Sequence, residues 1–416
     1  MTRTLTALAA LVVASPALAD KAGVVTTYAD IAQAGYEDSL TSAQRLRSAV
    51  EALISEPSAT THQAAKDAWL AARVPYQQTE VFRFGNPIVD DWEGKVNAWP
   101  LDEGLIDYVD DSTVMGGENR YAELNVIANE SFKLSGEEVD AAEITPTLLE
   151  ETLHEADGVE ANVATGYHAI EFLLWGQDLN GTDHGAGERA WTDFASGEDC
   201  TNGNCDRRGA YLQAATDLLV SDLEWMAGQW AADGDARAAV TEDADAGLSA
   251  MLTGMGSLSY GEQAGERMKL GVMLNDPEEE HDCFSDNTHN SHFYDGLGIH
   301  NVYNGRYVRI DGTVVEGDSL SDLVAEADTD VDAALSDDLD HTVLQMAKLK
   351  AAAEAGFSYD QMLARGNEEG EALIMASVDA LVKQTRSIER AVTALGLNDI
   401  GFAGSDSLDD PNAVFQ

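Results

Sequence analysis

The hydrophobic positions of this chain recur every three or four residues over long stretches, which is the period of an amphipathic helix. Segment 26–55 is the clearest example, with Tyr28, Ile31, Leu46 and Val50 at such spacings. The same period predicts helices over segments 64–84, 211–230, 243–255, 318–335, 341–355 and 368–395. Pro75 predicts a kink within 64–84, because proline disturbs a helix interior.

Strand alternation is rare. Segment 302–315 is the one hairpin candidate, with turns expected at Asn304-Gly305 and Asp311-Gly312. Long helices with few strands predict an all-α fold of helical bundles, with at most a minor β-hairpin. The polar stretch 196–208 is the best boundary, so we expect two tandem helical-bundle domains over 20–205 and 206–416.

The first residues have the pattern of a signal peptide. Arg3 precedes an apolar run over 5–14, and Ala17-Leu18-Ala19 forms a small-x-small cleavage site. We expect cleavage after Ala19 and therefore an exported protein, which in a bacterium with two membranes is periplasmic. No later stretch is long and apolar enough to span a bilayer.

Three cysteines follow. Cys200 and Cys205 enclose a tight-turn sequence, and in an oxidising compartment we expect a disulfide there, with a metal clip as the alternative. Cys283 is left over, as a buried or a reactive thiol.

The charge excludes several classes of partner. The 416 residues include 24 Lys+Arg and 75 Asp+Glu, so the net charge is −51. Nucleic acids need a basic face, and an anionic membrane would repel the chain. The hydrophobic content of 44% argues against disorder. A saline habitat or metal capture by carboxylates would explain the acidity.

The sharpest candidate site is GYHAIE at 166–171. On a helix His168 and Glu171 share a face and can reach one ion, and imidazole with carboxylate suits zinc or iron. The alternative is a buried His–Glu pair with a structural role. Glu80 and Arg83 lie one turn apart among aromatic residues, as a buried charged pair or an ordinary surface ion pair.

Segment 276–295 concentrates histidines and carboxylates. It could bind a metal or another ligand, or it could be an acidic loop that caps helices; its candidates are His281, Asp286, His289, His292 and Asp295. Segment 178–183 (DLNGTD) superficially suggests a calcium loop, but it lacks the EF-hand pattern, so a polar turn is expected.

The two halves resemble each other. Segment 166–181 aligns with 290–305 at a constant offset of 124, which pairs His168 with His292 and Glu171 with Asp295. Glu80-x-x-Arg83-x-Gly85 likewise resembles Glu266-x-x-Lys269-x-Gly271. We therefore expect a duplicated helical-bundle unit.

These motifs resemble the imelysin-like family. Gly166-x-His168-x-x-Glu171 is similar to the family signature, and Tyr76 with 80–84 fits its upstream motif. Segments 259–268 and 278–289 resemble the branch known as iron-regulated protein A. The resemblance implies two helical-bundle domains with a site near their interface, a cell-envelope location and a link to iron uptake. It also implies a peptidase alternative, because the founding member is described as an insulin-cleaving metallopeptidase.

The residues weigh against a common zinc peptidase. The sequence has no HExxH motif: after His154-Glu155, the position of the second histidine is occupied by Gly158. The inverted motif, HxxEH, is also absent, because Phe172 follows Glu171. We therefore expect a periplasmic metal-binding protein, with iron favoured and zinc possible, in which His168, Glu171 and Glu80 are ligands. Arg83 would orient a carboxylate; secondary candidates are Glu266, His292, Asp295, His281, Asp286 and His289. The expected partners are the metal ion and other iron-uptake components of the envelope. A zinc-dependent peptidase and a non-catalytic envelope interaction protein are the alternatives.

Overall fold

A computed structural model describes residues 20–110, 119–397 and 400–415 of the chain. The predicted signal peptide, 1–19, lies outside these residues. The described part begins with α1 (Lys21–Ser55), whose N-terminus is capped by Asp20 through a hydrogen bond from the Gly23 amide. No helix in the described ranges is both long and apolar enough to cross a membrane.

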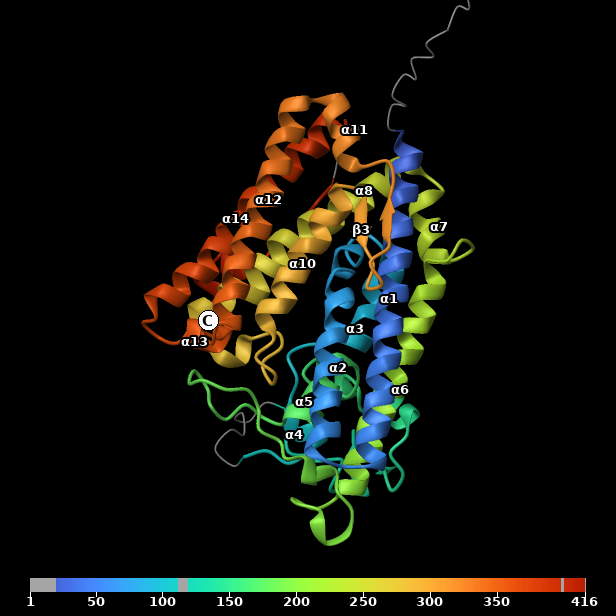
Figure 1. Cartoon of the computed structure of the whole chain (residues 1–416), viewed down its shortest axis with the longest axis vertical. Helices are drawn as coiled ribbons and strands as arrows, with labels where there is room; N and C mark the ends of the chain where they lie inside the picture. Colours follow the sequence, from blue (N-terminus) through green and yellow to red (C-terminus); the bar gives the residue numbers. More distant parts are fainter. Residues whose placement is uncertain (1–19, 111–118, 398–399, 416) are drawn as a thin grey trace, which may run out of the picture.

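One set of helices is organised around α1. The helices α2 (Ala59–Gln77) and α6 (Cys205–Gln229) pack along α1, and α5 (Gly166–Trp175) packs against α2, α6 and α3 (Pro87–Asn97) (Figure 1). Large aromatic side chains fill this interior, and the rings of Tyr36, Phe82 and Trp230 contact one another. Because α5 is enclosed by three helices, every one of its residues is buried.

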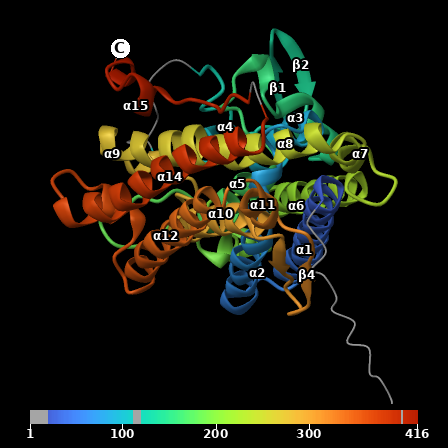
Figure 2. The ribbon, with the colours of Figure 1, turned by 90° about the horizontal axis from the view of Figure 1, so that it is seen from above.

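A second set is organised around α12 (Thr329–Glu354) and α14 (Glu368–Ala394), which pack along each other. A helical rod formed by α8 (Ala244–Ser257), the π-helix η6 (Leu258–Lys269) and α9 (Leu270–Leu274) runs beside α14 (Figure 2). The two sets are joined by α10 (Thr288–Tyr303), which contacts both α2 and α12. A Cβ atom at Gly298 would lie 2.6 Å from the Gln78 carbonyl oxygen, so glycine permits this close crossing of α10 and α2.

Two small antiparallel hairpins complete the fold. The predicted one is formed by β3 (Arg306–Val308) and β4 (Val314–Glu316), with its turn at Asp311-Gly312. Asn304-Gly305 ends α10 instead of starting a turn between strands. The pattern missed the other hairpin, β1 (Ser131–Leu134) and β2 (Glu137–Asp140), whose turn residues Ser135 and Gly136 both have positive φ.

The prediction of an all-α fold with minor β structure is confirmed, although the described residues form two hairpins instead of one. Two helix boundaries are clearly different. The helix predicted over 64–84 ends at Gln77 and is followed by the short η1 (Glu80–Phe82). α11 (Leu320–Ala327) ends early, and Asp328 caps α12 by accepting hydrogen bonds from the Asp330 and Val331 amides. The remaining helical elements are α4 (Glu103–Ile106), α7 (Asp235–Thr241), α13 (Tyr359–Leu363), α15 (Asp406–Asp409), η2 (Leu148–Leu153), η3 (Ala156–Gly158), η4 (Trp191–Phe194), η5 (Gly197–Asp199), η7 (Pro277–Glu279) and η8 (Ala413–Phe415).

The division at residue 205 and the internal duplication stay predictions. α6 begins at this point of the chain and packs against α1 and α5. The loop that precedes α6 is closed by a disulfide between Cys200 and Cys205. Cys283 is a free thiol, and burial raises its pKa well above the ordinary value.

Candidate metal centre

The position of the His168 helix is fixed by the glycine that precedes it. Gly166, the first residue of α5, has a φ of +79°, and a Cβ atom there would lie 2.4 Å from the Val96 carbonyl oxygen. The Thr165 hydroxyl donates a hydrogen bond to the Lys95 carbonyl at 2.9 Å. The start of α5 is therefore held against α3, and this contact explains the glycine of the GYHAIE motif.

His168 and Glu171 lie on one face of α5, as their spacing predicts. Nδ1 of His168 is 3.1 Å from Oε2 of Glu171, and both side chains are buried. The other carboxylate oxygen of Glu171 accepts hydrogen bonds from the amide (3.0 Å) and the hydroxyl (2.6 Å) of Ser285. The loop before α10 is thus tied directly to α5.

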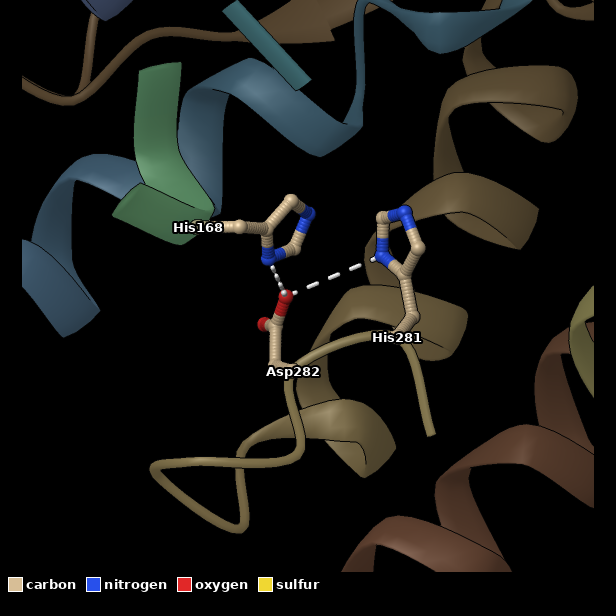
Figure 3. A group of neighbouring side chains, drawn as sticks. All are labelled: His168, His281 and Asp282. Carbon is tan, nitrogen blue, oxygen red and sulfur yellow. Dashed lines mark ion pairs between the residues drawn. The ribbon is translucent and has the colours of Figure 1, made fainter. Parts of the chain in front are cut away.

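The same loop brings a second histidine and a carboxylate to His168. Oδ1 of Asp282 lies 3.9 Å from Nδ1 of His168 and 3.7 Å from Nδ1 of His281, and both imidazoles turn this nitrogen towards it (Figure 3). The two rings are 4.8 Å apart between centroids. His168, His281 and Asp282 offer ligand atoms within 4.8 Å of one another. We call these three residues and Glu171 the histidine cluster.

Arg73 of α2 supplies the positive charge that this cluster contacts. Its Nη2 donates a hydrogen bond to Oδ1 of Asp282 at 2.6 Å and lies 3.3 Å from Nδ1 of His281. Its Nη1 donates to Oδ1 of Asn97 at 2.7 Å, and its side chain is buried. Because Nη2 contacts both a carboxylate and an imidazole, it stands where a cation shared by Asp282 and His281 would lie.

Burial determines the protonation of the cluster. Burial, reinforced by Arg73, lowers the pKa of His168 to about 3, and burial with Arg267 lowers that of His281 well below its ordinary value. Burial and the neighbouring Asp282 raise the pKa of Glu171 well above its ordinary value. For Asp282, burial would raise the pKa, but Arg73 and His168 outweigh it and the pKa is lowered.

This donor set fits a transition-metal ion. The low pKa values keep both imidazoles neutral at neutral pH, as metal ligands must be. Two imidazoles and a carboxylate are the ligand types of zinc sites and of non-haem iron sites. Nε2 of His168 is buried without a hydrogen-bond partner in the described part of the chain, so this imidazole is not fully used by the protein's own hydrogen bonds.

Glu80 and Arg83 belong to a neighbouring group that we call the arginine cluster. Arg267 of η6 lies 2.8 Å from Oε2 of Glu80, 2.8 Å from Glu262 and 3.2 Å from Asp295. Arg83 lies 3.4 Å from Glu93 and 3.5 Å from Glu262. Glu80 is therefore paired with Arg267. The arginine cluster consists of Glu80, Arg83, Glu93, Glu262, Arg267 and Asp295.

A cavity of about 400 Å³ lies between the two clusters. His281 lines it from the histidine cluster, and Arg83 and Arg267 line it from the arginine cluster. Five carboxylates also line this cavity, at Glu93, Glu155, Glu160, Glu262 and Glu266. Burial raises the pKa of Glu93 to about 7. Five acidic side chains around two arginines make the cavity a favourable path for a cation.

The other predicted residues lie apart from the histidine cluster. His292 on α10 is buried against the ring of Tyr359, at 5.2 Å between centroids, and neither of its nitrogens has a hydrogen-bond partner among the described residues. Asp295 contacts Arg267, and Glu266 is exposed. His289 contacts the Asn290 side chain. Asp286 lies near Asp178 and Asp360.

Five residues in or beside these clusters were not among the predicted site residues: Arg73, Glu93, Glu262, Arg267 and Asp282. Arg73 could have been found, because it is a charged residue on a helix face shared with Trp69 and Tyr76. Arg267 pairs with Glu262 five residues earlier, a spacing that a π-helix brings onto one face and an α-helix does not.

The sequence motifs anticipate a helical fold with a buried centre of histidines and carboxylates. The chain belongs to the imelysin family, a family filed among peptidases, whose sequence profile matches residues 32–388. No protein of curated function matches the chain.

Solved structures share the fold. A protein from Parabacteroides distasonis, described as an iron-regulated protein A precursor, superposes with a TM-score of 0.66 at 18% identity, over 92% of this chain and 97% of that one. An imelysin-like protein from Psychrobacter arcticum superposes with a TM-score of 0.56 at 16% identity, over 93% of this chain and 100% of that one.

Proposed function

We propose that this protein binds a transition-metal ion at the histidine cluster, with His168, His281, Asp282 and Glu171 as ligands. The observation that carries the proposal is the convergence of two neutral imidazoles and Asp282 within 4.8 Å of one another, in a buried position. Two histidines and a carboxylate are the ligand set both of many non-haem Fe(II) sites and of some zinc sites, so the donor set fits either metal. Iron is favoured because the fold is similar to that of a protein described as iron-regulated.

Arg73 gives the ion-free centre its counter-charge. Without an ion, its guanidinium neutralises Asp282, and Glu171 holds its proton. If a divalent ion were bound, Asp282 would contact it in place of Arg73, and Glu171 would give up its proton to solvent to serve as a ligand, so that binding would release one proton.

The burial of the ligands favours ion binding over peptide cleavage. His168, Glu171 and Asp282 are each at most 1% exposed, so a polypeptide could not reach an ion held among them without a rearrangement of the surrounding helices. A catalytic zinc site also needs an open coordination position and a base. The cavity beside His281 admits a small ion along its acidic wall.

The location proposed for this activity is the periplasm, with segment 1–19 as a signal peptide. Cell fractionation and mass spectrometry of the purified protein test this. The expected protein is periplasmic and starts at Asp20. A cytoplasmic protein that retains residues 1–19 would contradict it.

The binding claim is tested by titrating untagged, chelator-treated protein with Fe(II) under anaerobic conditions and with Zn²⁺. One ion per chain is expected for the wild type and for the control His341→Ala, because His341 is exposed. His168→Ala and His281→Ala should lose this ion while unfolding cooperatively. Unchanged stoichiometry and affinity in both variants would overturn the proposal.

A parallel assay addresses the peptidase alternative. Metal-loaded protein is incubated with an unstructured polypeptide, with and without a chelator. We expect no chelator-sensitive cleavage. If the wild type cleaved the polypeptide and His168→Ala did not, the bound ion would have a catalytic role.

A further inference from the structure

A second group of carboxylates lies outside the centre described above. Asp178 follows α5, Asp286 lies in the loop before α10, and Asp360 is in α13. Each offers a carboxylate oxygen, and these oxygens lie within 4.8 Å of one another. Glu280, from the same loop as Asp286, lies near enough to Asp360, Asp286 and Asp178 to interact with them electrostatically. We call these four residues the carboxylate cluster.

The carboxylate cluster contains buried oxygens without a well-formed hydrogen bond. Asp360 is 1% exposed; its carboxylate lies near the Ser358 hydroxyl and the Gln361 amide, yet neither of its oxygens has a hydrogen bond of good geometry in the described ranges. The same is true of Oε2 of Glu280, which is also 1% exposed, and of Oδ1 of Asp286. Buried carboxylates are normally hydrogen-bonded, paired with a cation or bound to a metal.

No lysine or arginine among the described residues forms a salt bridge with any of the four carboxylates, although His184 lies near enough to Asp360 to oppose the rise in pKa that burial causes. Burial and the neighbouring Asp360 raise the pKa of Asp286 to about 7. Converging acidic groups without a counter-charge create a local demand for a cation.

The ligand type suits a hard, oxygen-binding cation. Ca²⁺ accepts several protein carboxylates in a flexible geometry, whereas Mg²⁺ usually keeps several waters and binds one or two carboxylates.

We propose that Asp178, Glu280, Asp286 and Asp360 bind one calcium ion. Segment 178–183 alone lacks the ligands of a calcium loop, but the fold adds carboxylates from the loop before α10 and from α13. An ion there joins three segments that are distant in the sequence. One of them is the loop that carries His281 and Asp282, so the calcium ion stabilises the part of the protein that presents the histidine cluster.

The test is the thermal unfolding of the full chain at pH 8 in EGTA and in excess calcium. Calcium should raise the unfolding temperature of the wild type by about 3 °C or more at a hundredfold excess over Kd. The exposed control, Asp337→Asn, should respond equally. Asp178→Asn and Asp360→Asn should lose the rise and bind calcium at least about tenfold more weakly by calorimetry. Both variants should fold in EGTA, since each removes a like charge.

Two results would overturn the proposal. One is a wild-type response to calcium that Asp360→Asn and Asp178→Asn retain. The other is a wild type whose stability changes with pH but not with calcium, because the carboxylates then share protons instead of an ion. His168→Ala should keep the calcium response, so the proposal of a transition-metal site and the proposal of a calcium site are tested independently.

Discussion

Nη2 of Arg73 lies 2.6 Å from Oδ1 of Asp282, and both side chains are buried. This ion pair connects α2 of the first helical set to the loop that precedes α10. It also places a guanidinium at the position that a metal ion would share with Asp282. Arg73 therefore stabilises the ion-free protein and competes with the ion.

The variant Arg73→Gln separates these two effects. Without metal, it leaves Asp282 buried and unpaired, and the free energy of unfolding should fall by about 3–5 kcal/mol. Added Zn²⁺ should restore more stability to this variant than it adds to the wild type, because no guanidinium competes. Denaturant unfolding with and without Zn²⁺ measures both quantities.

The control for this prediction is Arg47→Gln, because Arg47 is partly exposed and its two carboxylate partners are 4.0 Å away. It should cost at most about 1 kcal/mol, with an unchanged response to Zn²⁺. A smaller response to Zn²⁺ in Arg73→Gln than in the wild type would contradict the role of Arg73 as a competitor.

Gly166→Ala should be strongly destabilising. A side chain at a φ of +79° costs about 1–2 kcal/mol, and the collision with the Val96 carbonyl adds about 1–3 kcal/mol. Gly158→Ala is the matched control, since Gly158 has a φ of +71° and open space around its Cβ position. Thermal or denaturant unfolding of the two variants separates the costs. Equal losses would show that the contact of α5 with α3 does not require glycine.

His62 predicts a specific acid sensitivity. Its Nε2 donates a hydrogen bond to the Leu174 carbonyl at 2.7 Å, and burial, with Lys66, lowers its pKa to about 4. In the unfolded chain the pKa of His62 is near 6.5. The stability that neutral His62 contributes is therefore fully present above pH 6.5 and is lost as the pH falls towards 4.

Between pH 7 and 5, this loss amounts to about 2 kcal/mol. His62→Gln should therefore lose about 2 kcal/mol less than the wild type over this range, in parallel denaturant titrations. The exposed His341→Gln should follow the wild type. Identical pH dependence of His62→Gln and the wild type would be inconsistent with a neutral, buried His62.

The sequence predicts the helices well where one apolar face persists, as in α1 and α14. The sequence is less informative where a single residue determines the end of a helix and where the strands of a hairpin are short. Asp328 ends α11 and starts α12 by capping the first amides of α12. In a stretch with many acidic residues, the sequence alone does not show which aspartate acts as this cap. The hairpin of β1 and β2 has a turn dipeptide, Ser135-Gly136, but each strand is only four residues long and the second, Glu137–Asp140, is mostly acidic, so no apolar alternation marks it.

The site is predictable only in part, because some of its contacts join residues that are distant in the sequence. His168 and Glu171 lie on one helix, so the helical period alone brings them together. Their contact with His281 and Asp282 depends on how the loop before α10 folds onto α5, and no local pattern encodes that. Glu80 illustrates the limit: it is buried near the centre, as an aromatic-rich segment suggests, but its partner is Arg267, from a π-helical segment.

The most direct test of the account is the position of the bound ion. Crystals of the wild-type protein soaked anaerobically with Fe(II) should give one strong anomalous peak at the iron edge, about 2.0–2.2 Å from nitrogen atoms of His168 and His281 and from an oxygen of Asp282. Arg73 should have withdrawn from Asp282. No iron peak at the histidine cluster, or a peak confined to other residues, would contradict the central claim.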